Sequence, residues 1–285
     1  MRTYPRRPVV IGLDEANDSL EAVRLAAIEA RLRRRPLDLV SVFPPLPPDR
    51  SAVEPWPPRD DAGRRMMRAT AVIERMRAGI DYDGRLEAGS LADLLVDRAR
   101  HADCVFIGPT ARHTATGPAA SELVAAHSVA PVCVVPMHTA LPGGPIVVGV
   151  AGIGGVEPLL RAAFPEAERR GVALQAVYVW SVVPNTALGT LDPFNYHPVA
   201  AAAEADRVLA EALAGWQEKF PDVDVHRRAL SGPDAERGLV AFTADASMVV
   251  VAPTSAPGRS VQLLGPVTRG LLHDARCPVL VVPMH

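Results

Sequence analysis

The sequence predicts an α/β protein with two tandem three-layer domains, each a five-stranded, mostly parallel, doubly wound sheet with helices on both faces. Three observations support this fold class. Short apolar runs without polar interruption, such as residues 248–252, are typical of strands buried on both faces. Segments with helical spacing separate these runs, which favours right-handed crossovers between parallel strands. The whole pattern then occurs a second time along the chain.

The repeat is visible by direct comparison of four apolar runs. In the first two, residues 8–13 (PVVIGL) match 145–150 (PIVVGV), and 37–43 match 174–180, both 137 positions apart. In the others, 104–109 match 248–253, and 131–138 (PVCVVPMH) match 278–285 (PVLVVPMH). Because the separation changes only between runs, length differences fall in the connections, where insertions are tolerated. We therefore expect domain 1 at residues 8–138 and domain 2 at residues 145–285.

Each element follows from local signals. Strands are expected at residues 9–13, 37–43, 82–87, 104–108 and 132–135, and helices from about residue 19 to 34, 60 to 78, 90 to 99 and 119 to 127. The second repeat copies this order, with helices at 156–170, 199–220, 234–244 and 267–274 and its third strand at 223–229. Ser90 is a good N-cap. Seven prolines in residues 44–58 predict a stiff crossover loop rather than a helix or a peptide ligand.

Composition excludes several classes of protein. The net charge of −2 gives no field that would attract nucleic acid or anionic lipid. No apolar stretch approaches the roughly 20 residues that span a bilayer, and no signal peptide is recognised. We expect a cytoplasmic protein with neither nucleic-acid nor membrane partners. Cys104, Cys133 and Cys277 lie in or beside apolar runs and are expected to be buried free thiols.

Three stretches together resemble the universal stress protein family in its tandem form. They are VVIGLD at 9–14, DCVFIG at 103–108 and LLHDARCPVLVVP at 271–283. The resemblance covers residues 8–136 and 145–283. It implies domains that dimerise through their last strands, so we expect an intramolecular pseudo-dimer, with a homodimer through the same strands as the other form. A protein partner is expected but not identified.

The family divides into members that bind ATP and members that do not. The resemblance implies that binders carry an Asp at the end of strand 1 and G-x2-G-x9-G-[ST] after strand 4. The carboxylate accepts from ribose or adenine groups, and the glycines let backbone N–H groups reach the phosphates. The last Gly-Ser begins a helix whose N-terminus favours anions.

Domain 1 keeps part of this motif. Gly12 and Asp14 end strand 1, Val42 stands where a backbone contact to adenine is implied, and Gly108 holds the first glycine position. Ala111 replaces the second glycine.

The rest of the domain 1 loop departs from the pattern. It is three residues shorter than its domain 2 counterpart, because Gly108 to Pro131 spans 23 positions and Ala252 to Pro278 spans 26. Gly117 is followed by Pro118 and fits the nine-residue spacing only with a gap. Glu122, near the helix start, is expected to repel a triphosphate.

Domain 2 has the full loop but the wrong residues. Ala151 replaces the Asp, and Ala252 and Ser255 replace the two glycines. Pro266 follows Gly265, which removes both the hydroxyl and an N–H donor. Val179 is the counterpart of Val42. Two or three lost charge-assisted contacts weaken binding by about 10²- to 10⁴-fold.

The function predicted from sequence is a non-catalytic stress-response or regulatory protein with degenerate nucleotide-binding motifs, acting through dimerisation or a partner. The alternative is an ATP-binding member, with slow hydrolysis, that uses Asp14 and Gly108. ATP would bind in domain 1 rather than domain 2. No His, Cys or carboxylate spacing suggests a metal site or a catalytic residue.

Overall fold

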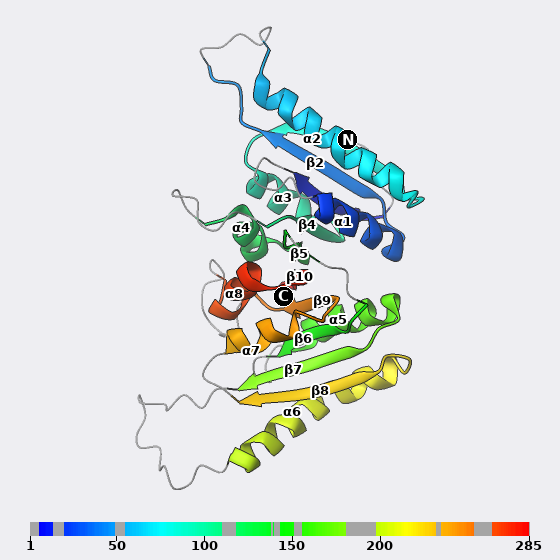
Figure 1. The fold of residues 1–285 in the computed structure, drawn as a ribbon, viewed down its shortest axis with the longest axis vertical. Coiled ribbons are helices and arrows are strands. Elements are labelled where there is room, and N and C mark those ends of the chain that lie inside the picture. The colour runs from blue at the N-terminus through cyan, green and yellow to red at the C-terminus, as the bar shows by residue number, and fades with distance from the viewer. Residues whose placement is uncertain are drawn as a thin grey trace.

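The computed structural model describes residues 6–13, 20–48, 55–109, 118–137, 139, 143–150, 156–180, 198–231, 235–253 and 264–284. Strands and helices alternate through these ranges (Figure 1). Domain 1 contains β1 (Val9–Leu13), α1 (Leu20–Arg33), β2 (Leu37–Phe43), α2 (Pro57–Met76), β3 (Tyr82–Ala88), α3 (Leu91–Ala99), β4 (Cys104–Ile107), α4 (Ala120–His127) and β5 (Val132–Val134). Domain 2 contains β6 (Ile146–Val150), α5 (Val156–Arg170), β7 (Leu174–Trp180), α6 (Pro198–Lys219), β8 (Val225–Ser231), α7 (Ala235–Phe242), β9 (Met248–Val251), α8 (Pro266–Asp274) and β10 (Val279–Val281).

The two domains share one continuous sheet. Its ten strands run in the order β3-β2-β1-β4-β5-β10-β9-β6-β7-β8. Within each domain the five strands are parallel, as the sequence predicts. The last strands of the two repeats, β5 and β10, pair in antiparallel fashion and join the two five-stranded halves.

The junction consists of the two apolar runs that end the repeats. Val279 pairs with Val134, and Val281 pairs with Val132. A strand of three apolar residues with an unpaired edge would expose both backbone groups and side chains to water. Pairing of β5 with β10 removes both edges and leaves β3 and β8 as the outer strands of the sheet.

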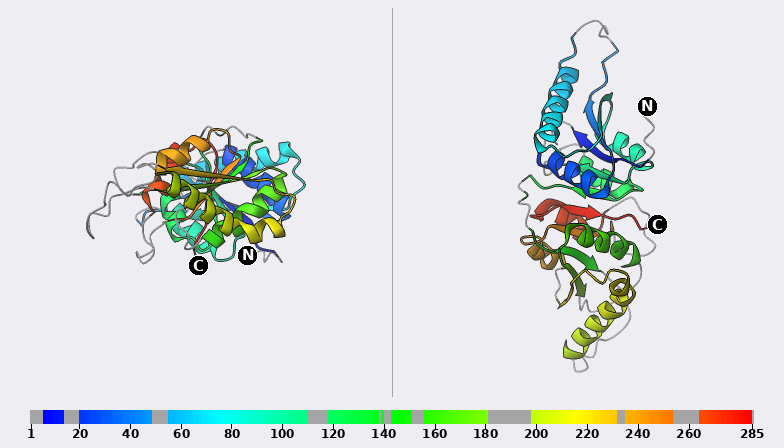
Figure 2. Two further views of the ribbon diagram at one scale, coloured as in Figure 1. Left: turned by 90° about the horizontal axis from the view of Figure 1, so that it is seen from below. Right: turned by 90° about the vertical axis from the view of Figure 1, so that its right-hand side faces the viewer.

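Helices cover both faces of this sheet along its full length (Figures 1 and 2). Apolar side chains of α1, α2, α5 and α6 pack on one face and form one core. Those of α3, α4, α7 and α8 pack on the other face and form a second core. Each core crosses the domain junction. The three-layer α/β architecture is therefore confirmed, and both cores stabilise the two domains as a unit.

Most element boundaries agree with the sequence, and the differences have local reasons. α2 begins at Pro57 rather than near residue 60, because proline has no N–H to lose in the first helical turn. β8 begins at Val225, two residues later than expected. Ser90 caps α3 as predicted, and its Oγ accepts from the Asp93 N–H at 3.5 Å.

All three cysteines are free and buried, as expected. Burial raises the pKa of the Cys277 thiol to about 12, although backbone N–H groups favour its thiolate. Burial also raises the pKa values of Cys104 and Cys133. Since the thiolate is the reactive form, these residues serve packing rather than redox chemistry.

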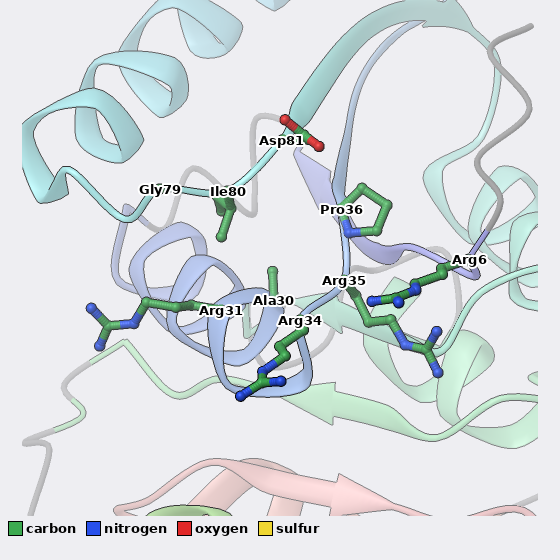
Figure 3. Close-up of a pocket in the computed structure, with 9 residues that line it drawn as sticks. All are labelled: Arg6, Ala30, Arg31, Arg34, Arg35, Pro36, Gly79, Ile80 and Asp81. Atoms are coloured by element: carbon green, nitrogen blue, oxygen red, sulfur yellow. The ribbon is translucent and has the colours of Figure 1, made fainter.

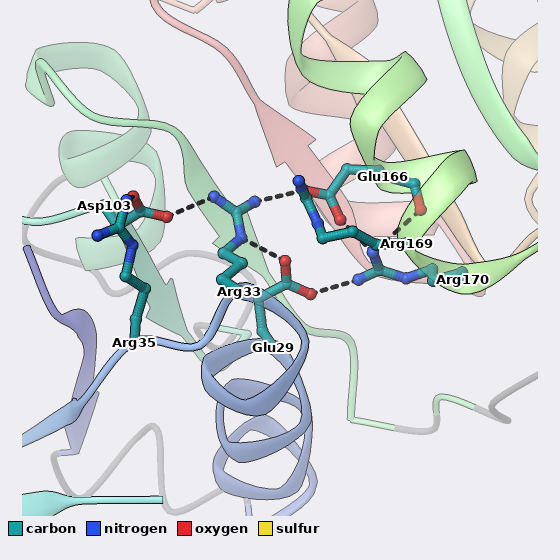
Figure 4. A network of polar contacts seen from close by, with 7 residues as sticks. All are labelled: Glu29, Arg33, Arg35, Asp103, Glu166, Arg169 and Arg170. Atoms are coloured by element: carbon teal, nitrogen blue, oxygen red, sulfur yellow. Dashed lines mark hydrogen bonds and ion pairs between the residues drawn. The ribbon is translucent and has the colours of Figure 1, made fainter. Parts of the chain in front are cut away.

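A buried ion-pair network joins α1 to α5 across the junction (Figure 4). Glu29 contacts Arg33 on its own helix and Arg170 on α5. Glu166 makes the reciprocal contacts with Arg170 and Arg33. Glu29 and Glu166 are 137 positions apart, as are Arg33 and Arg170, so the network repeats the separation of the strands. It is a symmetric contact between equivalent helices.

Burial of this network is nearly complete at its carboxylates. The side chains of Glu29 and Glu166 are 2% and 1% exposed. Asp103, before β4, adds a further contact to Arg33 at 2.7 Å, and Arg169 adds one to Glu166. The desolvation of two carboxylates is thereby balanced by several guanidinium groups.

Lowering the pH is expected to remove part of this stabilisation. Burial opposes ionisation of Glu29, but the charges of Arg170 and Arg33 outweigh it and lower its pKa from 4.5 to about 2. Because the folded-state pKa lies below the unfolded one, the contribution is complete above pH 4.5 and is lost as the pH falls toward 2.

This displacement corresponds to about 3 kcal/mol. Denaturant titrations should therefore show that the wild type loses about 3 kcal/mol more free energy of unfolding between pH ~5 and ~2 than Glu29→Gln does. Equal losses in the two proteins would mean that the Glu29 carboxyl titrates as in an unfolded chain.

Candidate functional site

The strand order creates one switch point in each domain. β1 lies between β2 and β4, and β6 lies between β7 and β9. Crossovers leave such a central strand toward opposite faces, which opens a crevice at the carboxyl ends of the strands. Gly12, Val42 and Val179 are each the last residue but one of a strand. Gly108 and Ala252 come directly after β4 and β9, so these five residues lie at the carboxyl edge of the sheet.

In domain 1 the strand register brings three of these residues to the same edge. Gly12 in β1 pairs with Val40 in β2 and with Ile107 in β4. Val42 is therefore two residues past the partner of Gly12, and Gly108 is one residue past its other partner. Asp14 and Ala111 lie outside the described residues.

Gly12 has a packing reason to be glycine. A Cβ on Gly12 would lie 2.6 Å from side-chain carbons of both Leu91 and Leu95 on α3. In domain 2 a Cβ on Gly149 would lie 3.0 Å from Leu239 on α7. The glycine near the end of the first strand thus admits a helix close to the sheet in both repeats.

The backbone carbonyl of Val42 is already occupied. Nη2 of Arg65, on α2, donates to this oxygen at 2.7 Å, and Arg65 is only 5% exposed. In the part of the chain that the structure describes, the Nε of Arg65 has no hydrogen-bond partner and no carboxylate pairs with the guanidinium. The group that the resemblance assigns to adenine recognition is bound to protein.

Sequence reasoning missed Arg65, although a signal was present. Ala62, Arg65, Ala69 and Ile73 are the buried residues of α2 and fall at helical spacing. An arginine on the apolar stripe of a helix is unusual and indicates either a specific acceptor or a ligand.

Glu122 faces the other domain. Nε2 of His273 on α8 lies 2.9 Å from its Oε1, and Nε of Arg269 lies 3.9 Å from its Oε2. The expectation that Glu122 acts by repelling a phosphate therefore needs correction, because its carboxylate contacts domain 2. Glu122 and Arg269 are 147 positions apart and thus equivalent in the repeat.

In domain 2 the residues at the start of α8 form hydrogen bonds with the residues that follow β9. The Gly265 N–H donates to the Pro253 carbonyl at 2.7 Å, and Pro266 supplies no N–H. Oγ1 of Thr268 donates to the carbonyl of Ala252 at 2.6 Å. The start of α8 therefore lacks two of the donors that usually hold an anion at a helix N-terminus.

The other two predicted residues of domain 2 add little. Ser255 lies outside the described residues. Val179 lies in β7, next to its last residue, in the same place that Val42 holds in β2. The domain 2 crevice therefore retains the strand framework of a nucleotide site.

The described residues contain neither a metal-binding cluster nor a membrane-spanning helix. No group of three or more His, Cys, Asp or Glu side chains there could hold a metal ion. None of the described helices has the length and hydropathy needed to cross a membrane.

Comparison with known proteins assigns the family. A model of the universal stress protein family matches residues 5–136 and 144–283. Universal stress protein Rv2005c of Mycobacterium tuberculosis is 34% identical over 293 residues, which cover 96% of each chain. A universal stress protein of Mycolicibacterium smegmatis is 29% identical, with 96% of each chain covered.

A solved structure has the same fold. The crystal structure of a universal stress protein from Archaeoglobus fulgidus matches 98% of this chain and 97% of its own, with a TM-score of 0.67 and 15% identity. The double match of the family model agrees with the internal repeat. This chain belongs to the universal stress protein family, in a tandem form with two such domains.

Proposed function

We propose that this protein is a non-catalytic stress-response or regulatory protein whose two nucleotide motifs do not hold ATP, and that it acts through its paired domains or a protein partner. The observation that carries the proposal is the hydrogen bond from Arg65 to the Val42 carbonyl. It occupies, in the better preserved motif, the acceptor that an adenine amino group would use.

An adenine amino group would have to share this carbonyl oxygen with Arg65 or displace the guanidinium. A hydrogen bond from a charged group contributes about 1.5–3 kcal/mol, which corresponds to about a 10- to 100-fold loss of affinity. The displaced guanidinium is 5% exposed and would need another acceptor. Competition from the protein itself thus adds to the missing second glycine at Ala111.

Domain 2 supports the same proposal by a different route. At the start of α8 the Gly265 N–H donates to the Pro253 carbonyl, and Pro266 has no N–H. Anions at helix N-termini depend on such free N–H groups. A triphosphate would therefore have to break the Gly265–Pro253 hydrogen bond to reach this donor.

ATP binding by domain 1, with slow hydrolysis, is the competing function. The position of Gly108 at the switch point beside β1 favours it, because glycine there lets backbone N–H groups approach a phosphate. The two functions predict different affinities for the same ligands.

Calorimetric titration with ATP and AMP tests the proposal. We expect the wild type to show no binding at micromolar concentrations. Arg65→Met should raise the affinity for AMP about tenfold or more, because it frees the Val42 carbonyl. Arg64→Met is the matched control, since this neighbouring arginine is exposed and pairs with Asp61.

Micromolar ATP binding by the wild type that Asp14→Ala abolishes would refute the proposal in favour of the ATP-binding alternative. Mass spectrometry of the denatured protein provides an independent check, since a tight nucleotide would co-purify.

A further inference from the structure

A cavity lies at the edge of the domain 1 sheet opposite the nucleotide motif, where strands β2 and β3 begin (Figure 3). Its volume is about 350 Å³. Four arginines and one carboxylate supply its charged lining: Arg6, Arg31, Arg34, Arg35 and Asp81. The nucleotide motif lies at the carboxyl ends of the strands, so this cavity is a separate site.

The cavity carries a surplus of positive charge. Arg35 has a carboxylate partner, Asp103, at 3.3 Å. Arg6, Arg31 and Arg34 have no carboxylate partner in the described ranges. An anion in the cavity would be attracted by all three positive charges.

The backbone gives an independent indication. Arg34 has a φ of 54°, in the left-handed region that favours glycine. Among the described non-glycine residues, only Arg34 and Arg77 have positive φ, and they follow the ends of α1 and α2. Glycine is the usual residue in this conformation just past a helix, so an arginine there is unusual.

Domain 2 shows what the same turn requires when this function is absent. Its equivalent of Arg34 is Gly171, with a φ of 62°. The turn hydrogen bonds match, because the Arg34 N–H donates to the Arg31 carbonyl at 3.1 Å and the Gly171 N–H donates to the Glu168 carbonyl at 3.1 Å. The backbone turn is therefore satisfied by glycine, and arginine is an addition of domain 1.

The charges of the two edges are opposite. Glu168 stands in place of Arg31, and Asp222 and Asp224 precede β8 where Gly79 and Asp81 precede β3. Arginine in the last turn of a helix also stabilises the helix dipole, which accounts for Arg31. It does not account for Arg34, which lies beyond the helix, or for Arg6, which precedes β1.

We propose that this cavity binds a compact polyanion with two or more phosphoryl groups. Guanidinium groups donate in a planar fork that matches phosphate oxygens, and several together hold more than one phosphoryl group. Ala30, Pro36 and Ile80 lie between the arginines and give the cavity an apolar side (Figure 3). Inorganic polyphosphate and the phosphate tail of a nucleotide share this chemistry.

Calorimetric titration of the full chain with pyrophosphate, tripolyphosphate and ADP at physiological salt tests the proposal. We expect saturable 1:1 binding of tripolyphosphate. Arg34→Gly should weaken it about tenfold or more, because it removes one charge-assisted contact. This variant should keep the wild-type Tm or raise it, since Gly171 shows that glycine fits the turn.

Arg77→Gly is the matched control. It relieves the same backbone strain and removes the same charge, but Arg77 does not line the cavity, so tripolyphosphate binding should remain. If ADP binds, tripolyphosphate does not, and Arg34→Gly weakens ADP binding, then the ligand of the cavity is a nucleotide whose base is required for binding.

Three results would overturn the proposal. They are the absence of saturable binding of any probe, equal losses in Arg34→Gly and Arg77→Gly, and loss of binding in Gly108→Val with retention in Arg34→Gly. The last result would assign the anion to the nucleotide motif.

Discussion

Replacement of Glu29 by alanine is expected to lower the free energy of unfolding at neutral pH by about 3–5 kcal/mol, the usual effect of breaking a buried ion pair. The Glu29 side chain is 2% exposed and contacts Arg33 on its own helix and Arg170 on α5. Its loss leaves both guanidinium groups buried with Glu166 as their main remaining carboxylate. The two helices lie on either side of the domain junction, so the substitution is expected to destabilise both domains.

Urea denaturation followed by circular dichroism provides the measurement. Glu157→Ala is the matched control, because Glu157 pairs with Arg161 on α5 with side chains 66% and 71% exposed. An exposed pair of this kind contributes less than about 1 kcal/mol. Equal losses in the two variants would show that burial of the network adds nothing to stability.

Gly144→Ala is expected to lower the free energy of unfolding by about 2–3 kcal/mol, because it forces a side chain into a packed backbone. A Cβ on Gly144 would overlap the carbonyl oxygen of Asp245 and lie 2.8 Å from its carbonyl carbon. The Ser247 hydroxyl also donates to the carbonyl of Gly144. The linker into β6 is thus fixed against the turn before β9, and neither side can move freely.

The adjacent glycine offers a matched control. A Cβ on Gly143 would meet no heavy atom within 4 Å, so Gly143→Ala should change stability by less than about 0.5 kcal/mol. Thermal and urea unfolding of the two variants should separate them clearly. If both lost the same amount, the effect would come from linker entropy rather than from contact with Asp245.

Fold prediction from the sequence succeeded where the signal is local. Uninterrupted apolar runs identify β1, β4, β6 and β9, because a strand buried on both faces has no polar alternation. Ser90 identifies the start of α3 through its side-chain cap. The prolines at the start of α2 led to a predicted helix start that is too late, because proline suits both a loop and a first helical turn.

Prediction of the candidate site was less complete. Gly12, Val42 and Gly108 do reach one edge of the sheet, as expected from strand ends. Whether the Val42 carbonyl is free depends on Arg65, which is 23 residues away in sequence and reaches it from another layer. The direction of Glu122 likewise depends on α8, which belongs to the other domain.

The sequence by itself determined the family, the repeat and the two parallel half-sheets, because hydrophobic periodicity and small-residue spacing are properties of each segment alone. Only the tertiary structure decided the antiparallel register in which β5 and β10 pair. It also decided that Glu29 pairs with Arg170 and Glu166 with Arg33 across that junction. Residues so far apart in sequence meet only when the two folded domains pack. Contacts between distant segments depend on the packing of whole layers, which no local pattern contains.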